Sequence, residues 1–198
     1  MSHTIRASVV QTCTASYSLP ATLDKLERLT RLARDRDGTQ LALFPEALYV
    51  DLICCNWLIK RFPTLLSIGG YPKMSTFGVV VGERSPEGRD EFLRYHSAAI
   101  DIPSPAISRI ESISKDTGVF LVVGVVERDG GTLYCTVVFI DPQKGYLGKH
   151  RKLVPTAMER LIWGQGDGST LPVLEKQFKS SKDDETIVEA KISAAICW

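Results

Sequence analysis

The fold is decided by residues 5–44, which read IRASVVQTCTASYSLPATLDKLERLTRLARDRDGTQLALF. Residues 5–13 and 40–44 are mostly apolar runs of strand length, and each predicts a buried strand. Between them the sequence has the spacing of an amphipathic helix. A strand, a helix and a second strand in succession predict parallel pairing through a right-handed crossover, because parallel neighbours need a long connection. We therefore expect an α/β fold.

The predicted helix has recognisable ends. Ser18 or Thr22 can cap its first turn, and Gly38 follows its last residue. Its leucines recur every third residue, so we expect them to share one buried face: Leu23, Leu26, Leu29 and Leu32. The opposite face is basic and indicates a solvated surface rather than a ligand site: Lys25, Arg28, Arg31 and Arg34.

The rest of the chain predicts helices first and strands afterwards. Helices are expected over residues 87–100 and 104–117. The sequence Asp-Gly-Gly at 129–131 is typical of a tight hairpin turn, so the strands around it should form an antiparallel meander. A surface loop is expected over residues 179–185. Strands are expected at four places: 119–127, 132–140, 145–149 and 191–198.

Composition excludes several classes of protein. The 198 residues include 24 basic and 23 acidic side chains, and this near-neutral balance argues against nucleic-acid binding. No apolar run reaches the roughly 18 residues of a membrane span, and the amino terminus lacks the apolar core of a secretory signal. The five cysteines lack metal-ligand spacing, so neither a zinc site nor a disulfide framework is expected. We expect a single cytoplasmic domain over residues 1–198 with no membrane partner.

Three reactive side chains fall at predicted strand ends, where open α/β sheets bind ligands. Glu46 follows an apolar run and a proline, although a surface glutamate at the start of a loop would look the same. Lys152 ends a basic run, 149–152, that can equally be a solvated patch. Cys197 is either a nucleophile or a small buried hydrophobe. The glycine-rich stretch 163–169 allows close backbone approach to a ligand, or a pair of tight turns.

Together these segments resemble the nitrilase branch of the carbon-nitrogen hydrolase superfamily over nearly the whole chain. Glu46 stands in a Phe-Pro-Glu-Ala phrase, Lys152 in an Arg-Lys-Leu-x-Pro-Thr phrase, and Cys197 in an Ile-Cys-Trp phrase. Glu159 follows the lysine at the spacing of a second family glutamate. The resemblance implies an α-β-β-α sandwich, here incomplete at the C-terminus, with two sheets packed face to face between outer helices.

The resemblance also implies a role for each of these residues. Cys197 would be the nucleophile and Glu46 the general base. Lys152 would stabilise the tetrahedral species, and Glu159 would orient the lysine and a water molecule. The implied reaction converts a nitrile to a carboxylic acid and ammonia through a thioimidate and a thioester, with no metal or organic cofactor.

Other functions remain open. A cyanide hydratase or an amidase relative would share the same Glu-Lys-Cys trio. A non-catalytic remnant, or one half of a sandwich completed by a separate chain, is an alternative of a different class. For the intact family the resemblance implies a homo-oligomer, and the partner expected for the site is a small nitrile.

Two features depart from the family pattern. Residues 48–67 separate Phe-Pro-Glu-Ala from the Ile-Gly-Gly-Tyr-Pro phrase at 68–72, where the family has a single aromatic residue. Codons for 48–50 can embed the splice donor GTATGT and codons for 66–67 can supply CAG, so we interpret this segment as a translated intron. The chain also ends one residue after Cys197. We therefore expect the isolated chain to be unstable and to have little or no activity.

Overall fold

A computed structural model describes residues 4–12, 15, 17–44, 84–183 and 185–196. In this part of the chain the fold is α/β, as expected, with a five-stranded mixed sheet in the order β1-β2-β3-β4-β5. The first three strands are parallel and the last three form an antiparallel meander. The strands are β1 (Ala7–Val9), β2 (Leu41–Phe44), β3 (Phe120–Asp129), β4 (Thr132–Asp141) and β5 (Gly145–Arg151).

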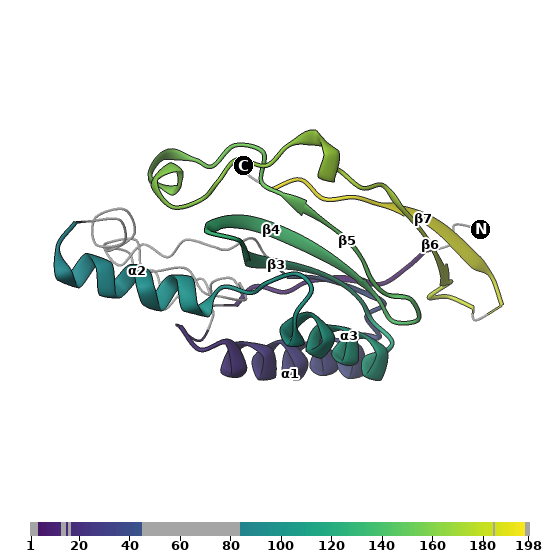
Figure 1. The fold of residues 1–198 in the computed structure, drawn as a ribbon. Coiled ribbons are helices and arrows are strands. Elements are labelled where there is room, and N and C mark those ends of the chain that lie inside the picture. The colour runs from purple at the N-terminus through teal and green to yellow at the C-terminus, as the bar shows by residue number, and fades with distance from the viewer. Residues whose placement is uncertain (1–3, 13–14, 16, 45–83, 184, 197–198) are drawn as a thin grey trace, which may run out of the picture.

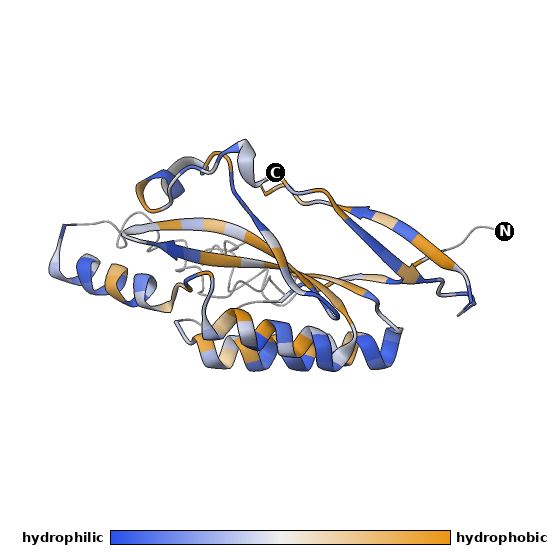
Figure 2. Ribbon diagram, turned by 45° about the vertical axis from the view of Figure 1, so that its right-hand side comes forward, coloured by the Kyte–Doolittle hydropathy of each residue, from blue (hydrophilic) through white to orange (hydrophobic). Residues whose placement is uncertain are grey.

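Two helices cover one face of this sheet. Helices α1 (Leu19–Asp37) and α3 (Pro105–Thr117) run side by side beneath it in Figure 1, and α2 (Pro86–Ala98) lies toward one end. Ile107, Ile110 and Ile113 form an apolar stripe on α3 that is buried against the strands. In Figure 2 the helices carry both polar and apolar residues, whereas the central strands carry long hydrophobic stretches.

Helix α1 confirms the predicted ends but not the whole predicted face. Ser18 is its N-cap residue, and Gly38 ends it in the left-handed conformation at φ 64°. Leu23 and Leu26 are buried, but Leu32 is 47% exposed, so its assignment to the buried face was wrong. Each three-residue step turns only about 300° around a helix, so such a series drifts off the face it began on. Positions closer to the true period are buried instead: Thr22, Thr30 and Ala33.

A hairpin forms a second layer on the other face of the sheet. Its strands β6 (Leu174–Lys179) and β7 (Ile187–Ile192) pair only with each other among the described strands. Phe178 packs edge-on against Phe120 of β3, with ring centroids 6.4 Å apart, and so joins the two layers. The predicted last strand at 191–198 was therefore placed too late, and β6 was not predicted. The loop between the two strands falls where it was expected.

Three of the sequence predictions concern residues outside the described part of the chain. The interpretation of residues 48–67 as a translated intron concerns one such segment. Glu46 and Cys197 also lie outside the described part of the chain. Among the helices that the structure describes, none is long and apolar enough to cross a membrane.

Candidate active site

Lys152 lies immediately after β5, between strand β4 and the segment that follows β5. Its backbone N–H donates a hydrogen bond to the carbonyl of Cys135 on β4 at 2.8 Å, and its carbonyl accepts one from Gly166 at the same distance. The side chain is only 3% exposed. A buried ammonium group requires a nearby negative charge, because removing a cation from water is costly.

That charge comes from Glu159. The Lys152 ammonium nitrogen lies 2.8 Å from Oε2 of Glu159, and the same oxygen accepts the backbone N–H of Thr156 at 2.6 Å. Thr156 and Glu159 form a capping box at the start of the 3-10 helix η1 (Ala157–Leu161). The capping box holds the carboxylate in place, and the Pro-Thr phrase after the lysine therefore has a local structural reason.

The glycine-rich stretch lies against the protein's own backbone. A Cβ atom at Gly166 would lie 2.5 Å from the carbonyl oxygen of Arg151 and 2.8 Å from that of Lys152. Gly164 donates its N–H to Leu133 of β4, and a Cβ there would meet the Tyr134 ring at 2.8 Å. These two glycines therefore allow the stretch to pack closely on the strands next to Lys152.

A second buried pair lies beside the lysine. The ammonium nitrogen of Lys152 is 5.8 Å from the centre of the Trp163 ring, and Trp163 donates its indole N–H to the hydroxyl of Tyr95 at 2.9 Å. Tyr95 is completely buried and Trp163 is 3% exposed. Burial raises the pKa of Tyr95 well above its usual range, although the Trp163 hydrogen bond opposes this, so the hydroxyl stays neutral.

Sequence reasoning did not single out either residue of this pair. Trp163 has a weak signal, since it comes four residues after Glu159 and begins the glycine-rich stretch. Tyr95 has none, because it lies on α2, in a different part of the chain. Only the fold brings α2 against the residues that follow β5.

The basic run 149–152 is not a solvated patch. Arg151 donates to both oxygens of Glu127 on β3, at 2.9 and 2.5 Å, and Lys149 pairs with the same carboxylate. Both basic residues face the helix-covered side of the sheet, opposite to Lys152. His150 is 1% exposed and hydrogen-bonds through Nδ1 to the carbonyl of Thr170 at 2.9 Å.

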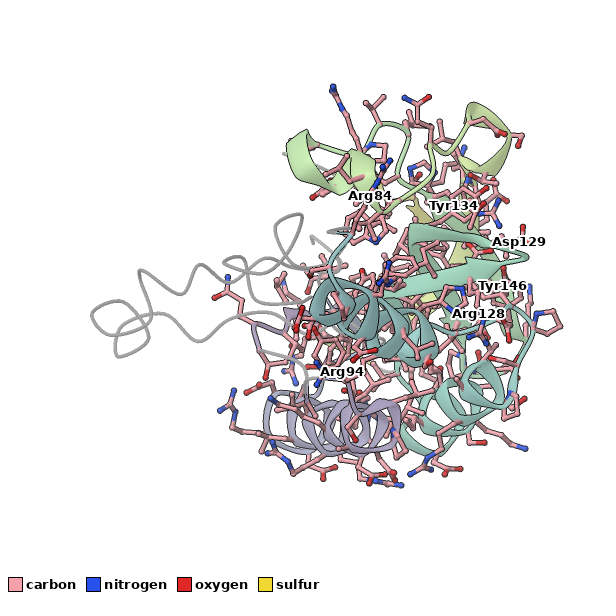
Figure 3. All side chains as sticks on the ribbon, turned by 60° about the vertical axis from the view of Figure 1, so that its left-hand side comes forward. Arg84, Arg94, Arg128, Asp129, Tyr134 and Tyr146 are labelled. Atoms are coloured by element: carbon pink, nitrogen blue, oxygen red, sulfur yellow. The ribbon has the colours of Figure 1, made fainter. Side chains whose placement is uncertain are left out.

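Glu127 is therefore the centre of a charged network at one end of β3, β4 and β5. It also accepts a hydrogen bond from Thr136 at 2.8 Å, and Arg151 stacks over the Tyr134 ring at 3.8 Å. Asp129 pairs with Arg151 at 2.7 Å. Asp129 and Tyr134 are both labelled at this end of the sheet in Figure 3.

Of the four predicted site residues, the structure brings Lys152 and Glu159 together. Their contact satisfies one requirement of the proposed site. The meeting of Glu46, Lys152 and Cys197 stays a prediction. Ile196, the residue before Cys197, packs against the cluster that contains Trp163.

These features define an α/β protein with a buried ion pair at a strand end, a typical position for a catalytic site. The chain belongs to the carbon-nitrogen hydrolase family, since the model of that family matches residues 6–198. The chain is 66% identical over its full length to an arylacetonitrilase of Trametes versicolor, 56% of which it covers. It is 49% identical over 98% of its length to a bifunctional nitrilase/nitrile hydratase of Nicotiana tabacum, 47% of which it covers.

Solved structures agree on the fold. An amidase from Nesterenkonia sp. matches 88% of this chain with a TM-score of 0.55 at 20% identity, and the chain covers 52% of that structure. A glutamate-to-glutamine mutant of the same amidase, with acrylamide added at its active-site cysteine, matches 98% of the chain with a TM-score of 0.58 at 17% identity, over 57% of its length. The chain spans about half the length of the curated relatives named above.

Proposed function

We propose that this chain carries the catalytic residues of a nitrilase, which converts a nitrile to a carboxylic acid and ammonia. The observation that supports this most is the buried Lys152–Glu159 pair. It occurs in a chain 66% identical to an arylacetonitrilase. A cation held by a fixed carboxylate, out of water, is suited to stabilise charge that develops during a reaction.

The first half of the reaction attaches the substrate. Glu46 accepts the proton of the Cys197 thiol, and the resulting thiolate attacks the nitrile carbon. One C–N π bond breaks, and the nitrogen takes a proton to give a thioimidate. A water molecule then adds to the C=N bond, with Glu46 as general base, and forms a tetrahedral intermediate that carries OH, NH2 and sulfur substituents.

The second half releases the products. The tetrahedral intermediate collapses, ammonia leaves with one more proton, and a thioester remains on Cys197. A second water molecule hydrolyses the thioester to the carboxylic acid and regenerates the thiol. The overall balance is one nitrile and two water molecules to one acid and one ammonia. Lys152 stabilises the charge on the tetrahedral species, and Glu159 holds Lys152 in position.

The same intermediate has a second outcome, and this supports a second candidate function. If the sulfur leaves before the nitrogen, the product is an amide, which corresponds to nitrile hydration. The Nicotiana relative is described as a bifunctional nitrilase/nitrile hydratase. The ratio of acid to amide therefore distinguishes the two candidates, and acid is the product we expect to dominate. Hydrolysis of phenylacetamide added as substrate would indicate an amidase instead.

The test uses phenylacetonitrile, with phenylacetic acid, phenylacetamide and ammonia measured together. Cys197→Ser, Lys152→Met and Glu46→Gln are made in this chain and at the matching positions of the Trametes arylacetonitrilase. Each change should lower turnover by about a hundredfold or more in the relative. In the relative, mass spectrometry of a quenched reaction should find the acyl adduct on the cysteine that matches Cys197 and not in the corresponding serine variant. An adduct on another cysteine, or unchanged turnover in the substituted relative, contradicts the proposal.

Two further predictions concern the chain rather than its chemistry. We propose that residues 48–67 are encoded by an intron, and a spliced transcript that still encodes Trp57 would contradict this. A cytoplasmic location and a homo-oligomer of the intact protein are also proposed. Fractionation of cells that express the protein, and its mass in solution, test these two.

A further inference from the structure

We infer that Tyr95 is a positioning residue for Lys152, acting through the ring of Trp163. The catalytic consequence of this inference rests on the proposed function, but the positioning itself does not. The hydroxyl of Tyr95 accepts the indole N–H of Trp163 at 2.9 Å, and the face of the indole lies 5.8 Å from the Lys152 ammonium nitrogen. The three side chains form a continuous series from α2 to the strand end.

Burial makes this series sensitive to the loss of one contact. Tyr95 is 0% exposed, and Trp163 and Lys152 are each 3% exposed, so water has little access to any of them. An indole N–H that loses its acceptor in such surroundings is left unsatisfied unless the ring moves. Movement of the ring changes the surface that faces the ammonium group. The hydroxyl of Tyr95 therefore sets the position of the indole.

The indole in turn is one of the contacts that orient the ammonium group. Another is the carboxylate of Glu159, at 2.8 Å. An aromatic ring face attracts a cation through its quadrupole, and the attraction increases where water is excluded. A carboxylate alone allows a lysine to rotate about its long side chain. A carboxylate together with a ring face restricts where the ammonium nitrogen lies.

The same cluster contacts the residue that precedes the proposed nucleophile. Tyr95 and Trp163 pack with Leu133 and Cys135 of β4, and Ile196 packs against this group. Lys152 is bonded through its backbone to Cys135. The cluster thus borders both the lysine and the residue before Cys197. A change at Tyr95 should therefore affect the site although this side chain belongs to α2.

The first test measures the accessibility of Lys152 and needs no enzymatic activity. The folded chain is treated with a low concentration of acetic anhydride, and the acetylated lysines are quantified by peptide mass spectrometry. Tyr95→Phe should increase the acetylation rate of Lys152 by about three- to tenfold, the effect of one lost hydrogen bond between neutral groups. Lys176, held by Asp141 on β4 at 2.7 Å, should react at an unchanged rate.

A matched variant controls for the loss of a tyrosine hydroxyl. Tyr146 is a partly buried tyrosine on β5 that packs in the helix-covered core, and it is labelled in Figure 3. Tyr146→Phe should leave the acetylation of Lys152 unchanged. Equal effects of the two variants, or a general increase that includes Lys176, would mean that Tyr95 only supports folding, and would overturn the inference.

The second test asks whether Tyr95 acts through Trp163. If it does, adding Tyr95→Phe to a Trp163→Phe protein should change Lys152 acetylation by less than about twofold, since the indole N–H is already absent. Equal effects of Tyr95→Phe in both backgrounds would contradict the series. If Trp163→Phe fails to fold, the comparison of Tyr95→Phe with Tyr146→Phe still tests whether Tyr95 positions Lys152.

The third test addresses catalysis at the matching positions of the Trametes arylacetonitrilase. Tyr95→Phe should lower kcat for phenylacetonitrile about three- to tenfold and leave KM nearly unchanged, since a displaced lysine affects the transition state more than substrate binding. If the acetylation rate of Lys152 changes but kcat does not, Tyr95 still positions Lys152. The catalytic role of Lys152 is then contradicted. An unchanged acetylation rate overturns the positioning whatever kcat does.

Discussion

The basic run 149–152 shows that neighbouring residues of one segment can be buried on opposite faces of a sheet. Alternation along β5 sends Lys149 and Arg151 to Glu127 on one face of the sheet and His150 and Lys152 to the other. Lys152 is then neutralised by Glu159, seven residues later in the sequence. A run that looks uniform in sequence thus divides between two separate clusters.

The buried pair should matter for stability as well as for catalysis. Glu159→Ala should lower the free energy of unfolding by about 3 kcal/mol, because it leaves a buried ammonium group without that carboxylate. Urea denaturation measures the change. Glu175→Ala is the control, since Glu175 forms a long, exposed pair with Lys191 at 3.9 Å and should cost less than about 1 kcal/mol. If the two variants lose a similar free energy of unfolding, the buried pair stabilises the fold no more than the exposed pair does.

Gly166 supports a second prediction for a single residue. Gly166→Ala should lower the free energy of unfolding by about 1–3 kcal/mol, because the new methyl group would collide with the carbonyls of Arg151 and Lys152. Gly168→Ala is a matched control two residues away, where nothing lies within 4 Å. It should change the stability by less than about 0.5 kcal/mol. If the two alanine variants unfold at the same urea concentration, the close packing is not required.

At the scale of elements, the charged network of Glu127 ties three strands together and should make their stability depend on pH. Burial by itself raises the pKa of Glu127, but hydrogen bonds from Arg151, Lys149 and Thr136 outweigh it, so the pKa lies below its usual value. A carboxyl group with a lowered pKa stabilises the fold above the pKa of the unfolded chain, about 4.3, and this stabilisation is lost as the pH falls through the folded pKa.

The corresponding experiment compares the wild type with Glu127→Gln by urea denaturation between about pH 7 and pH 3. The wild type should be more stable at neutral pH, and the difference should shrink as the pH falls below about 4. Thr136→Val is the control, because it removes one hydrogen bond and keeps the charges. It should retain the pH dependence of the wild type. A difference between wild type and Glu127→Gln that stays constant with pH would contradict the role of the carboxylate charge.

Sequence patterns predicted some helices and strands well and missed others. Helix α3 begins after Ser104 and ends at Gly118, close to the predicted bounds, because proline, glycine and an isoleucine stripe all indicate the same helix. The hairpin of β3 and β4 turns at the predicted glycines. Strand β6 was missed because polar side chains alternate along it on the outer side. Its inward residues, Leu174 and Phe178, form a pattern too short to stand out.

At the scale of the whole molecule, the two layers are held together by contacts between distant segments. Phe178 of the hairpin lies against Phe120, and Lys176 of the hairpin pairs with Asp141 of β4. Ser181 donates its backbone N–H to the carbonyl of Thr4 near the start of the chain. Ile196 packs against both the cluster between the layers and the cluster that contains Trp163, so the two groups of buried residues are adjacent.

The packing between the layers can be tested at Phe178. Phe178→Ala should lower the free energy of unfolding by about 3–5 kcal/mol, since it removes a buried ring from the contact. Hydrogen exchange of the Phe178→Ala variant should be faster than that of the wild type, and the increase should be larger for the amides of β7 than for those of β3. Val173→Ala, at a position 65% exposed, should be close to neutral. Uniformly faster exchange in both strands would mean that the two layers unfold as one unit.

Local sequence patterns were enough to predict the α/β class, the strand-helix-strand start and the hairpin turn. They also identified the family phrase that contains Lys152, and Glu159 seven residues after it. These features are local, because caps, turns and periodic apolar residues act on near neighbours in the chain. Tertiary structure alone decided which face each basic residue occupies, and that Tyr95 of α2 meets Trp163. Such contacts join residues far apart in sequence, and they depend on how sheets and helices pack rather than on any local pattern.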